Sequence, residues 1–213
     1  MLLSISLPFR LLSSLAVLSL TVLPEAHALW PQPRNLQTGP PDSALRLASS
    51  DSFSISLAAV PNAPADLSAA AERTHAQLFN DQLGRLVLGR GTGDLPALER
   101  APTLTCLVLQ LDLDTSSGAG MSPGADGVRS IEVEARKPLG HRDEAYSLSV
   151  PADGGQALLR ANSTLGLFRG LNTFSQLWYT VNGVVYMLGV PLAIQDSPAY
   201  VRAWFVGLCV PGC

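Results

Sequence analysis

The residues best suited to chemistry are two adjacent acids, Asp143 and Glu144, in the sequence GHRDEAYSL. Paired carboxyl groups are common tools of general acid and base catalysis, in which one group gives a proton and another takes one. The pair also stands directly before AYSLSV, whose alternation of apolar and polar residues is typical of a strand. The residues alone leave two interpretations open: a catalytic pair, and a structural lead-in to the strand.

Two other patterns suggest ligand binding only weakly. The string GRGTG at 89–93 lacks the spacing of a dinucleotide-binding loop and the Lys-Ser/Thr of a P-loop, and Pro96 would interrupt a long helix behind it. We expect a plain turn there. Asp112 and Asp114 alternate along LQLDLDT, so they share one face of a strand, which we expect to be the wet one, and they offer too few oxygen ligands for calcium. These motifs predict no cofactor site.

The three cysteines do not indicate a metal site. Cys106 lies in the apolar run LTCLVLQLDL, where a free thiol usually behaves as a small core side chain. Cys209 and Cys213, in the final CVPGC, could form a disulfide in an oxidising compartment, which leaves one thiol unpaired. Because the spacing offers neither a histidine partner nor a second cysteine pair, we expect no bound metal.

Hydrophobic periodicity places the elements that would position these residues. A proline-rich stretch at 29–41 comes first, and a Gly, Ser and Pro cluster at 115–127 forms a loop. Alternating apolar residues predict strands at 53–60, 85–89, 104–113, 128–134, 145–150, 156–161, 184–188 and 191–194. Helices are expected at 65–83 and 161–179. The pattern predicts an α+β fold: a mixed sheet of several strands with the two helices packed on one face.

The second helix carries the clearest packing signal. Its apolar residues recur at the helical period and must cover a sheet: Leu167, Phe168, Leu171, Phe174, Leu177 and Trp178. We expect Asn162, Ser163 and Thr164 to cap its first amides, and Gly166 and Gly170 to allow close approach of another backbone. In the first helix the corresponding face consists of Leu67, Ala70, Ala71, Thr74, Leu78 and Phe79.

The first 28 residues resemble a secretory signal. Arg10 precedes an apolar run at 11–23, and Ala26-His27-Ala28 forms a small-x-small cleavage site. A membrane span is the alternative, but the run is shorter than the roughly 20 residues that cross a bilayer. We therefore expect a secreted protein without a membrane anchor. Without residues 1–28, one of 14 basic and one of 17 acidic residues are lost, so the net charge stays at −3 and we expect no nucleic-acid partner.

Longer strings resemble a known family. LGLFRGLNTFSQLWY at 165–179, RDEAYSLSVPADG at 142–154 and VPLAIQDSPAY at 190–200 are similar to the non-catalytic, zincin-like N-terminal domain of fungal beta-N-acetylhexosaminidases, which are glycoside hydrolases of family twenty. LWPQPRNLQTG and NDQLGRLVLGRG extend the resemblance back to Leu29. It covers about 29–200 and is weak between 92 and 129.

The resemblance implies that catalysis belongs to a partner domain. In the family this domain leads into a (β/α)8 barrel of about 250 residues that holds the catalytic groups, whereas thirteen residues follow Tyr200 here. An Arg-Gly of the family helps to bind the sugar; here Arg202 comes one residue early and Ala203 follows, so we transfer no such role. We expect a domain at 29–198 and an aberrant tail at 199–213 in place of the barrel.

The resemblance also bears on the acid pair. Family members use an adjacent Asp-Glu in the barrel, where the Glu is the general acid and the Asp orients the acetamido group of the substrate. RDEAYSLSV instead matches the start of a strand in the N-terminal domain. We therefore interpret Asp143 and Glu144 as structural, and His141 as a solvated loop residue, and we assign no catalytic residue.

Three functions follow as hypotheses. The first is a truncated, secreted hexosaminidase domain, inactive alone, whose parent enzyme releases terminal N-acetylhexosamine from chitin fragments and glycoconjugates. The second is an in-trans folding or interaction partner of a separate catalytic barrel. The third is a free sugar-binding module, for which Trp30, Trp178 and Trp204 could supply stacking surfaces.

One modification is expected. Asn162-Ser163-Thr164 is an N-x-S/T sequon, which a secretory signal would deliver to the glycosylation machinery. The alternative is that Asn162 only caps the following helix, because a side chain buried at the helix start could not carry a sugar freely.

Overall fold

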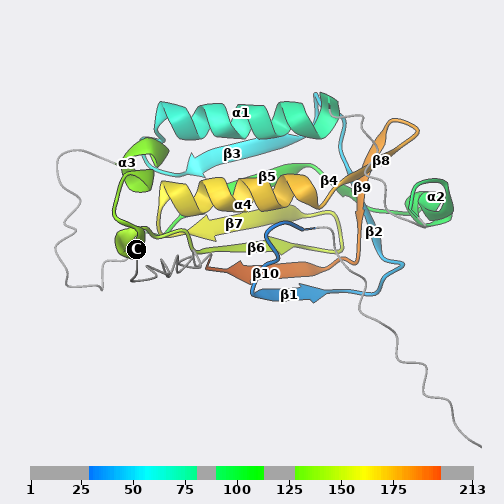
Figure 1. Ribbon diagram of the computed structural model, residues 1–213. Coiled ribbons are helices and arrows are strands. Elements are labelled where there is room, and N and C mark those ends of the chain that lie inside the picture. The colour runs from blue at the N-terminus through cyan, green and yellow to red at the C-terminus, as the bar shows by residue number, and fades with distance from the viewer. Residues whose placement is uncertain (1–28, 81–89, 113–127, 198–213) are drawn as a thin grey trace, which may run out of the picture.

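A computed structural model describes residues 29–80, 90–112 and 128–197 of the chain (Figure 1). The predicted α+β class is confirmed, with two mixed sheets instead of one. The larger sheet has the order β1 (Asn35–Thr38), β10 (Leu192–Asp196), β6 (Tyr146–Val150), β7 (Gln156–Ala161), β5 (Cys106–Leu111) and β3 (Ser54–Ala59). The smaller sheet has the order β4 (Thr103–Leu104), β2 (Ala44–Leu47), β9 (Val184–Leu188) and β8 (Tyr179–Val181).

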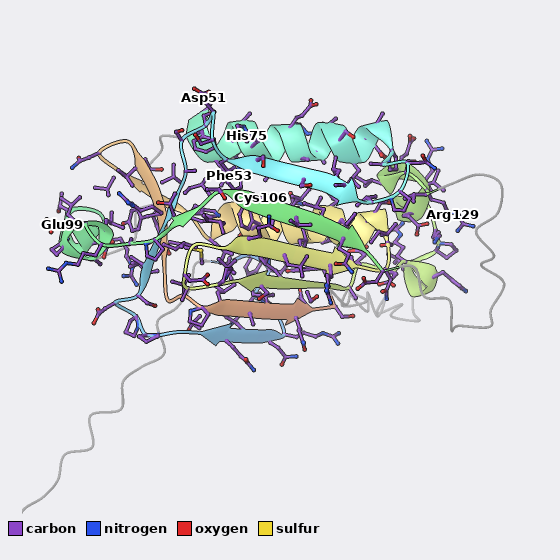
Figure 2. All side chains as sticks on the ribbon, turned by 180° about the vertical axis from the view of Figure 1, so that it is seen from behind. Asp51, Phe53, His75, Glu99, Cys106 and Arg129 are labelled. Atoms are coloured by element: carbon purple, nitrogen blue, oxygen red, sulfur yellow. The ribbon has the colours of Figure 1, made fainter. Side chains whose placement is uncertain are left out.

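Two long helices, α1 (Ala65–Asn80) and α4 (Thr164–Gln176), lie side by side on one face of the larger sheet (Figure 1). Shorter elements are the turns η1 (Thr92–Asp94) and η2 (Leu139–His141) and the helices α2 (Leu95–Leu98) and α3 (Ile131–Ala135). The main core fills the space between the sheet and the helices. Seen from behind in Figure 2, the strands lie in front of α4.

Strand direction sets the geometry of one edge. β3, β5 and β7 are parallel neighbours, and β6 runs antiparallel to them, so that β10, which pairs antiparallel with β6, runs in the same direction as β7. Because α1 follows β3 and α4 follows β7, the carboxyl ends of the parallel strands and the amino ends of both helices meet at one edge of the sheet. We call this the carboxyl edge.

Burial follows the predicted alternation on the helix-facing side of the sheet. In β5, Leu107, Leu109 and Leu111 are buried, whereas the residues between them are half-buried. Cys106 is therefore not the core side chain that we expected: it begins the strand on the opposite face and is a half-buried free thiol (Figure 2). The expected apolar faces of α1 and α4 are buried as well, with Phe79 and Phe168 partly so.

The helix α4 lies close to the sheet, as we expected from its two glycines. A Cβ atom on Gly166 would stand 2.4 Å from the carbonyl oxygen of Ala145, and one on Gly170 would stand 2.2 Å from a methyl carbon of Leu159. The helix begins one residue after Ser163, whose Oγ accepts the amide of Gly166 at 2.9 Å. Ser163 is thus the N-cap, and the expectation that Asn162 and Thr164 would share this role is wrong, since Asn162 precedes the cap and Thr164 is the first residue of the helix.

Several predicted elements differ from the structure. The expected strand at 128–134 is wrong: it contains α3, because Ser130 accepts the amide of Val133 as an N-cap and two glutamates lie in the favourable first turn. The proline-rich stretch contains β1, and the second helix ends at Gln176 so that Tyr179 begins β8. The last two strands were expected in one sheet, but β9 and β10 belong to different sheets.

The close approach of α4 leads to a test. Gly166→Ala should lower the free energy of unfolding by about 1–3 kcal/mol, because the new methyl group meets backbone rather than a movable side chain. Gly93→Ala is the matched control, since a Cβ there meets nothing within 4 Å, and it should change stability by less than about 0.5 kcal/mol. Urea denaturation measures both, and equal effects would contradict the close-packing argument.

Candidate functional site

The carboxyl edge is the first place to look for a site. In open sheets with parallel strands, ligands commonly bind in the crevice outside the carboxyl ends of the strands. Here the segment 128–145, which we call the edge cap, lies across this position and contains α3 and η2 (Figure 1). It contacts the start of both long helices.

Hydrogen bonds attach the edge cap to both helices. The amide of Glu132 donates to Oδ2 of Asp66 at 3.1 Å, at the start of α1. At the start of α4, the hydroxyl of Thr164 donates to the carbonyl of Arg129 at 2.9 Å, and the hydroxyl of Ser163 donates to the carbonyl of Asp143. The helix amino ends are therefore occupied by the chain itself.

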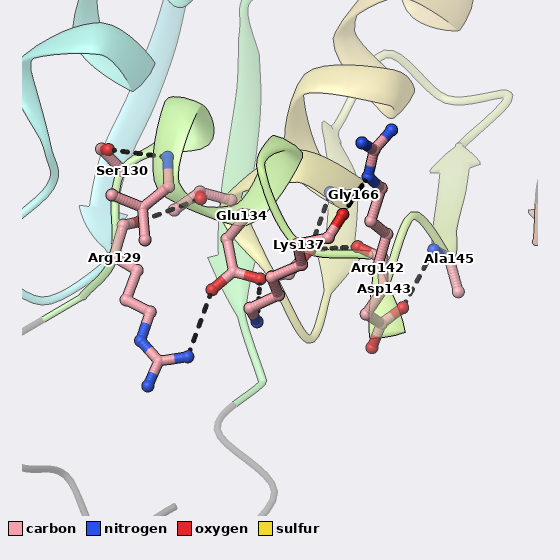
Figure 3. A network of polar contacts seen from close by, with 11 residues as sticks. Arg129, Ser130, Glu134, Lys137, Arg142, Asp143, Ala145 and Gly166 are labelled. Carbon is pink, nitrogen blue, oxygen red and sulfur yellow. Dashed lines mark hydrogen bonds and ion pairs between the residues drawn. The ribbon is translucent and has the colours of Figure 1, made fainter. Parts of the chain in front are cut away.

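The acid pair closes the edge cap. Oδ1 of Asp143 accepts the amide of Ala145 at 3.0 Å, which turns the chain into β6 (Figure 3). The side chain of Glu144 is 3% exposed, and its Oε2 accepts Nε of Arg169 on α4 at 2.8 Å. Oε1 of Glu144 is buried without a hydrogen-bond partner within the described residues. A general acid must reach its substrate, and the buried Glu144 serves an internal ion pair instead.

Further charged groups surround a second buried acid, Glu134. Figure 3 shows it between Arg129 and Lys137. Nη1 of Arg129 lies 3.8 Å from Oε1 of Glu134, and Nζ of Lys137 is paired with Oε2. Arg142 completes the arrangement by donating from Nε to the carbonyl of Lys137 at 2.7 Å. The polar groups of the edge cap mainly bind one another.

A separate buried cluster explains the glycine-rich string. The hydroxyl of Tyr186 donates to Oδ2 of Asp94 at 2.6 Å, and the amide of Gly91 donates to the same carboxylate at 3.0 Å and to the Tyr186 oxygen at 3.1 Å. Burial, and then the hydrogen bond to Asp94, raises the pKa of Tyr186 to about 12. The described part of the string, residues 90–93, therefore leads into the turn η1, which is fixed to β9.

Another buried tyrosine joins α4 to the end of the larger sheet. The hydroxyl groups of Tyr146 and Thr173 are 2.6 Å apart, and Tyr146 also donates to Oδ2 of Asp196 at 3.5 Å. Burial raises the pKa of Tyr146 from 10.0 to about 12, a shift that the hydrogen bond to Thr173 opposes and the charge of Asp196 supports. The neutral phenol is therefore the form that the fold requires.

The pocket beside α4 and β9 offers little room for a ligand. A cavity of about 10 Å³ beside Arg90 and Gln176 has space for about one water molecule and none for a sugar ring. Within the described ranges, no three His, Cys, Asp or Glu side chains are grouped so that they could hold a metal ion. No helix in this part of the chain is long and apolar enough to span a bilayer.

Comparison with known proteins identifies the family. A family model described as beta-acetyl hexosaminidase like matches residues 29–177. This chain belongs to that family. Beta-hexosaminidase subunit beta of Mus musculus is 32% identical over 175 residues, which cover 81% of this chain and 27% of the mouse protein. The chain thus spans about a quarter of the length of this relative.

Two solved structures of hexosaminidase-type enzymes are also similar. The chitobiase of Flavobacterium johnsoniae has a TM-score of 0.44 and 19% identity, over 80% of this chain and 20% of that one. A family-20 exo beta-N-acetylglucosaminidase from Vibrio harveyi has a TM-score of 0.42 and 14% identity, over 81% of this chain and 19% of that one. The sequence matches confirm the resemblance to a hexosaminidase N-terminal domain. The fungal type and the zincin-like description stay predictions.

The structure of this hexosaminidase-like chain shows where the remaining predicted residues lie. His141 is exposed as expected, although it ends the turn η2 rather than lying in a loop. Asp112 is half-buried, and its Oδ1 accepts Nε2 of Gln110 at 2.8 Å. Some predictions lie outside the described residues: the signal at 1–28, the strand at 85–89, Asp114, the tail at 199–213, and Cys209 with Cys213.

The sequence interpretation missed the pairings that make up the buried polar contacts. Asp94 and Tyr186 are 92 residues apart, Tyr146 and Asp196 are 50 apart, and Glu144 and Arg169 are 25 apart. The signal available was the presence of polar residues within apolar runs, as in VVYML and LAIQD. That signal indicates that a partner is needed but does not name it.

The Glu144–Arg169 pair predicts an asymmetric response to mutation. Arg169→Met should lower the free energy of unfolding by about 2–4 kcal/mol at pH 7, because it removes the cation that pairs with the buried carboxylate of Glu144, which is 3% exposed. Glu144→Gln should cost less, since the side chain of Arg169 is 34% exposed and can hydrate. Arg136→Met is the control: its pair with Glu132 is largely exposed and contributes less than about 0.5 kcal/mol. Urea denaturation that ranks the first two variants in reverse would contradict this assignment.

The two buried tyrosines predict loss of stability at high pH. Because folding raises both pKa values from 10.0 to about 12, the unfolded chain loses these protons first. Their contribution to the free energy of unfolding should be complete below pH 10 and should fall as the pH rises to 12. For each tyrosine the loss is at most about 1.4 kcal/mol per unit of difference between its folded and unfolded pKa. Urea denaturation between pH 9 and 11.5 measures the slope, and Tyr146→Phe should reduce it by about half. A flat profile for the unmutated chain would contradict the prediction.

Proposed function

We propose that this chain provides the non-catalytic N-terminal domain of a secreted beta-N-acetylhexosaminidase of the fungal type. The parent enzyme would hydrolyse terminal non-reducing N-acetylhexosamine from chitooligosaccharides and glycoconjugates, with its chemistry in a (β/α)8 barrel. The observation that carries the proposal is the family match at 29–177, within a chain that covers 27% of a beta-hexosaminidase subunit.

The geometry supports a non-catalytic role. The edge where parallel strands usually present a ligand site is covered by the edge cap, and its acid pair is committed to an ion pair and a turn. In glycosidases two carboxyl groups face each other across the substrate at a distance of about 5–9 Å. The internal contacts of Asp143 and Glu144 explain these two acids without such a role. Their contacts hold α4 and β6 together instead.

Secretion and glycosylation are part of the proposal. Asn162 is exposed and does not cap α4, which removes the obstacle that a buried cap would pose to an N-linked sugar. The leader-like composition of residues 1–28 supports an extracellular destination. We expect no nucleic-acid partner for a chain with a net charge of −3.

Two alternatives remain as proposals. An in-trans folding or interaction partner of a separate barrel would have the same fold and would differ only in connectivity. A free sugar-binding module would depend on Trp30, which is 84% exposed, because Trp178 is buried and Trp204 lies outside the described residues.

The proposal predicts that the purified chain does not hydrolyse an aryl N-acetylglucosaminide. Release of the chromophore should equal the buffer blank, while an intact hexosaminidase of the family gives turnover under the same conditions. Glu144→Gln is the matched variant, and it should behave like the unmutated chain. Turnover that this variant abolishes would place catalysis here and overturn the proposal. Retention of the chain on chitin, lost in Trp30→Ala, would favour the sugar-binding alternative.

A further inference from the structure

The larger sheet has a face that no helix in the described part of the chain covers. Both long helices pack on the opposite face, and the view from behind in Figure 2 looks directly onto the strands. Side chains on this uncovered face alternate along each strand with the buried residues of the main core. Its chemistry therefore does not serve the packing of the core.

The strand register aligns five polar side chains across this face. Each lies opposite the next on a neighbouring strand, in the order Asn35, Gln195, Ser147, Arg160 and Gln110. We call these five residues the polar row. The two middle neighbours, Ser147 and Gln110, are half-buried, and the other three are exposed. Because the row crosses four intervals between strands of about 4.8 Å each, it is about 19 Å long.

Charge is nearly absent from the larger sheet. Its six strands contain two charged residues: Asp196, which is buried on the side of the core, and Arg160 in the polar row. Asp112 follows directly after β5, and its Oδ1 accepts Nε2 of Gln110 at 2.8 Å. Since charged residues make up about a quarter of a typical domain, the polarity of this face comes mainly from neutral amides and hydroxyls.

This composition distinguishes between classes of partner. The three large hydrophobic residues that are exposed in the described part of the chain are Trp30, Val133 and Leu139, and none lies on these strands. Protein interfaces usually depend on large anchors such as aromatic side chains, and nucleic acid needs many cations. A row of neutral donors and acceptors with one guanidinium instead suits an uncharged ligand that has many hydroxyl and amide groups.

A chain of N-acetylated sugars has this chemistry. Each acetamido group offers one N–H donor and one carbonyl acceptor, and the side-chain amides of Asn35, Gln195 and Gln110 offer the complementary groups. The guanidinium of Arg160 can donate to carbonyl or hydroxyl oxygens. An extended sugar chain laid along the row would meet a polar side chain at every strand, and about 19 Å accommodates roughly four sugar units.

We propose that the polar row is an accessory binding site for an extended, uncharged N-acetylhexosamine chain. The inference rests on the proposed function, because its ligand is the substrate class named there. The site is separate from the Trp30 alternative, since Gln176 of α4 holds the backbone of Trp30 through hydrogen bonds of 2.8 and 3.0 Å, on the other side of the sheet. Holding a long substrate chain on this face would raise its effective concentration at the parent enzyme.

The test is an NMR titration of the whole chain with chitohexaose, a soluble chain of six N-acetylglucosamine units. NMR suits this site because the row contains no aromatic side chain and binds through hydrogen bonds alone, hence weakly. Side-chain amide signals of Asn35, Gln110 and Gln195 and backbone signals of the strands around Ser147 should shift. Signals of α1 should stay in place. Absence of shifts along the row at the highest sugar concentration would overturn the site.

A matched pair of variants tests the row itself. Gln195→Ala with Arg160→Ala should weaken binding at least about fivefold, because it removes two hydrogen-bonding groups from the row. Gln77→Ala with Arg73→Ala removes the same groups from exposed positions of α1, and it should bind as the unmutated chain does. Thermal unfolding of both variants checks that the fold is retained. Equal binding by the two double variants would contradict the assignment.

Two further comparisons identify the ligand class and the location. Cellohexaose has the same length without acetamido groups and should bind at least about threefold more weakly; equal binding would overturn the amino-sugar assignment. Trp30→Ala should leave chitohexaose binding unchanged, and loss of binding in this variant would move the sugar site to the Trp30 alternative. These failures leave the proposed function intact, because that function is overturned separately, by turnover of an aryl N-acetylglucosaminide that Glu144→Gln abolishes.

Discussion

The contact between α4 and the larger sheet is the constraint on which the other features depend. Gly166 and Gly170 let the helix approach so closely that a Cβ at the first would collide with the carbonyl of Ala145, just before β6, and a Cβ at the second with Leu159 of β7. At that separation the hydroxyl groups of Ser163 and Thr164 reach the edge cap, and Arg169 reaches Glu144. A helix held farther out by two methyl groups would lose these contacts together, because hydrogen bonds weaken steeply with distance.

The covered carboxyl edge gives this arrangement its functional meaning. Parallel strands followed by helices usually leave their helix amino ends open to anions and substrates. Here Asp66 and Thr164 at those ends bind backbone groups of the edge cap. The adjacent Asp-Glu makes internal contacts instead, since the buried Glu144 pairs with Arg169 and Asp143 accepts the amide of Ala145.

Two buried tyrosines join further elements of the fold by hydrogen bonds. Tyr146 joins α4 to the end of β10 through Thr173 and Asp196, and Tyr186 joins η1 to β9 through Asp94. Buried polar groups of this kind add little net stability when they are paired, but an unpaired one costs much more. They therefore favour one arrangement of the strands over close alternatives.

Much of this fold was accessible from periodicity alone. The helix around Leu167 and Leu171, and the strands ending at Val150 and Ala161, were predicted because burial of one face imposes a local repeat. The α3 segment was misjudged because Ile131 and Val133 alternate equally well in a strand, and only the cap at Ser130 and the packing of Ile131 decide for a helix. The sequence by itself determined the fold class, the family and the close-packing glycines, since each is written in consecutive residues. The tertiary structure decided that Glu144 faces Arg169, that Asp94 meets Tyr186 and that Val133 points outward, because these depend on which distant segments share an edge of the sheet.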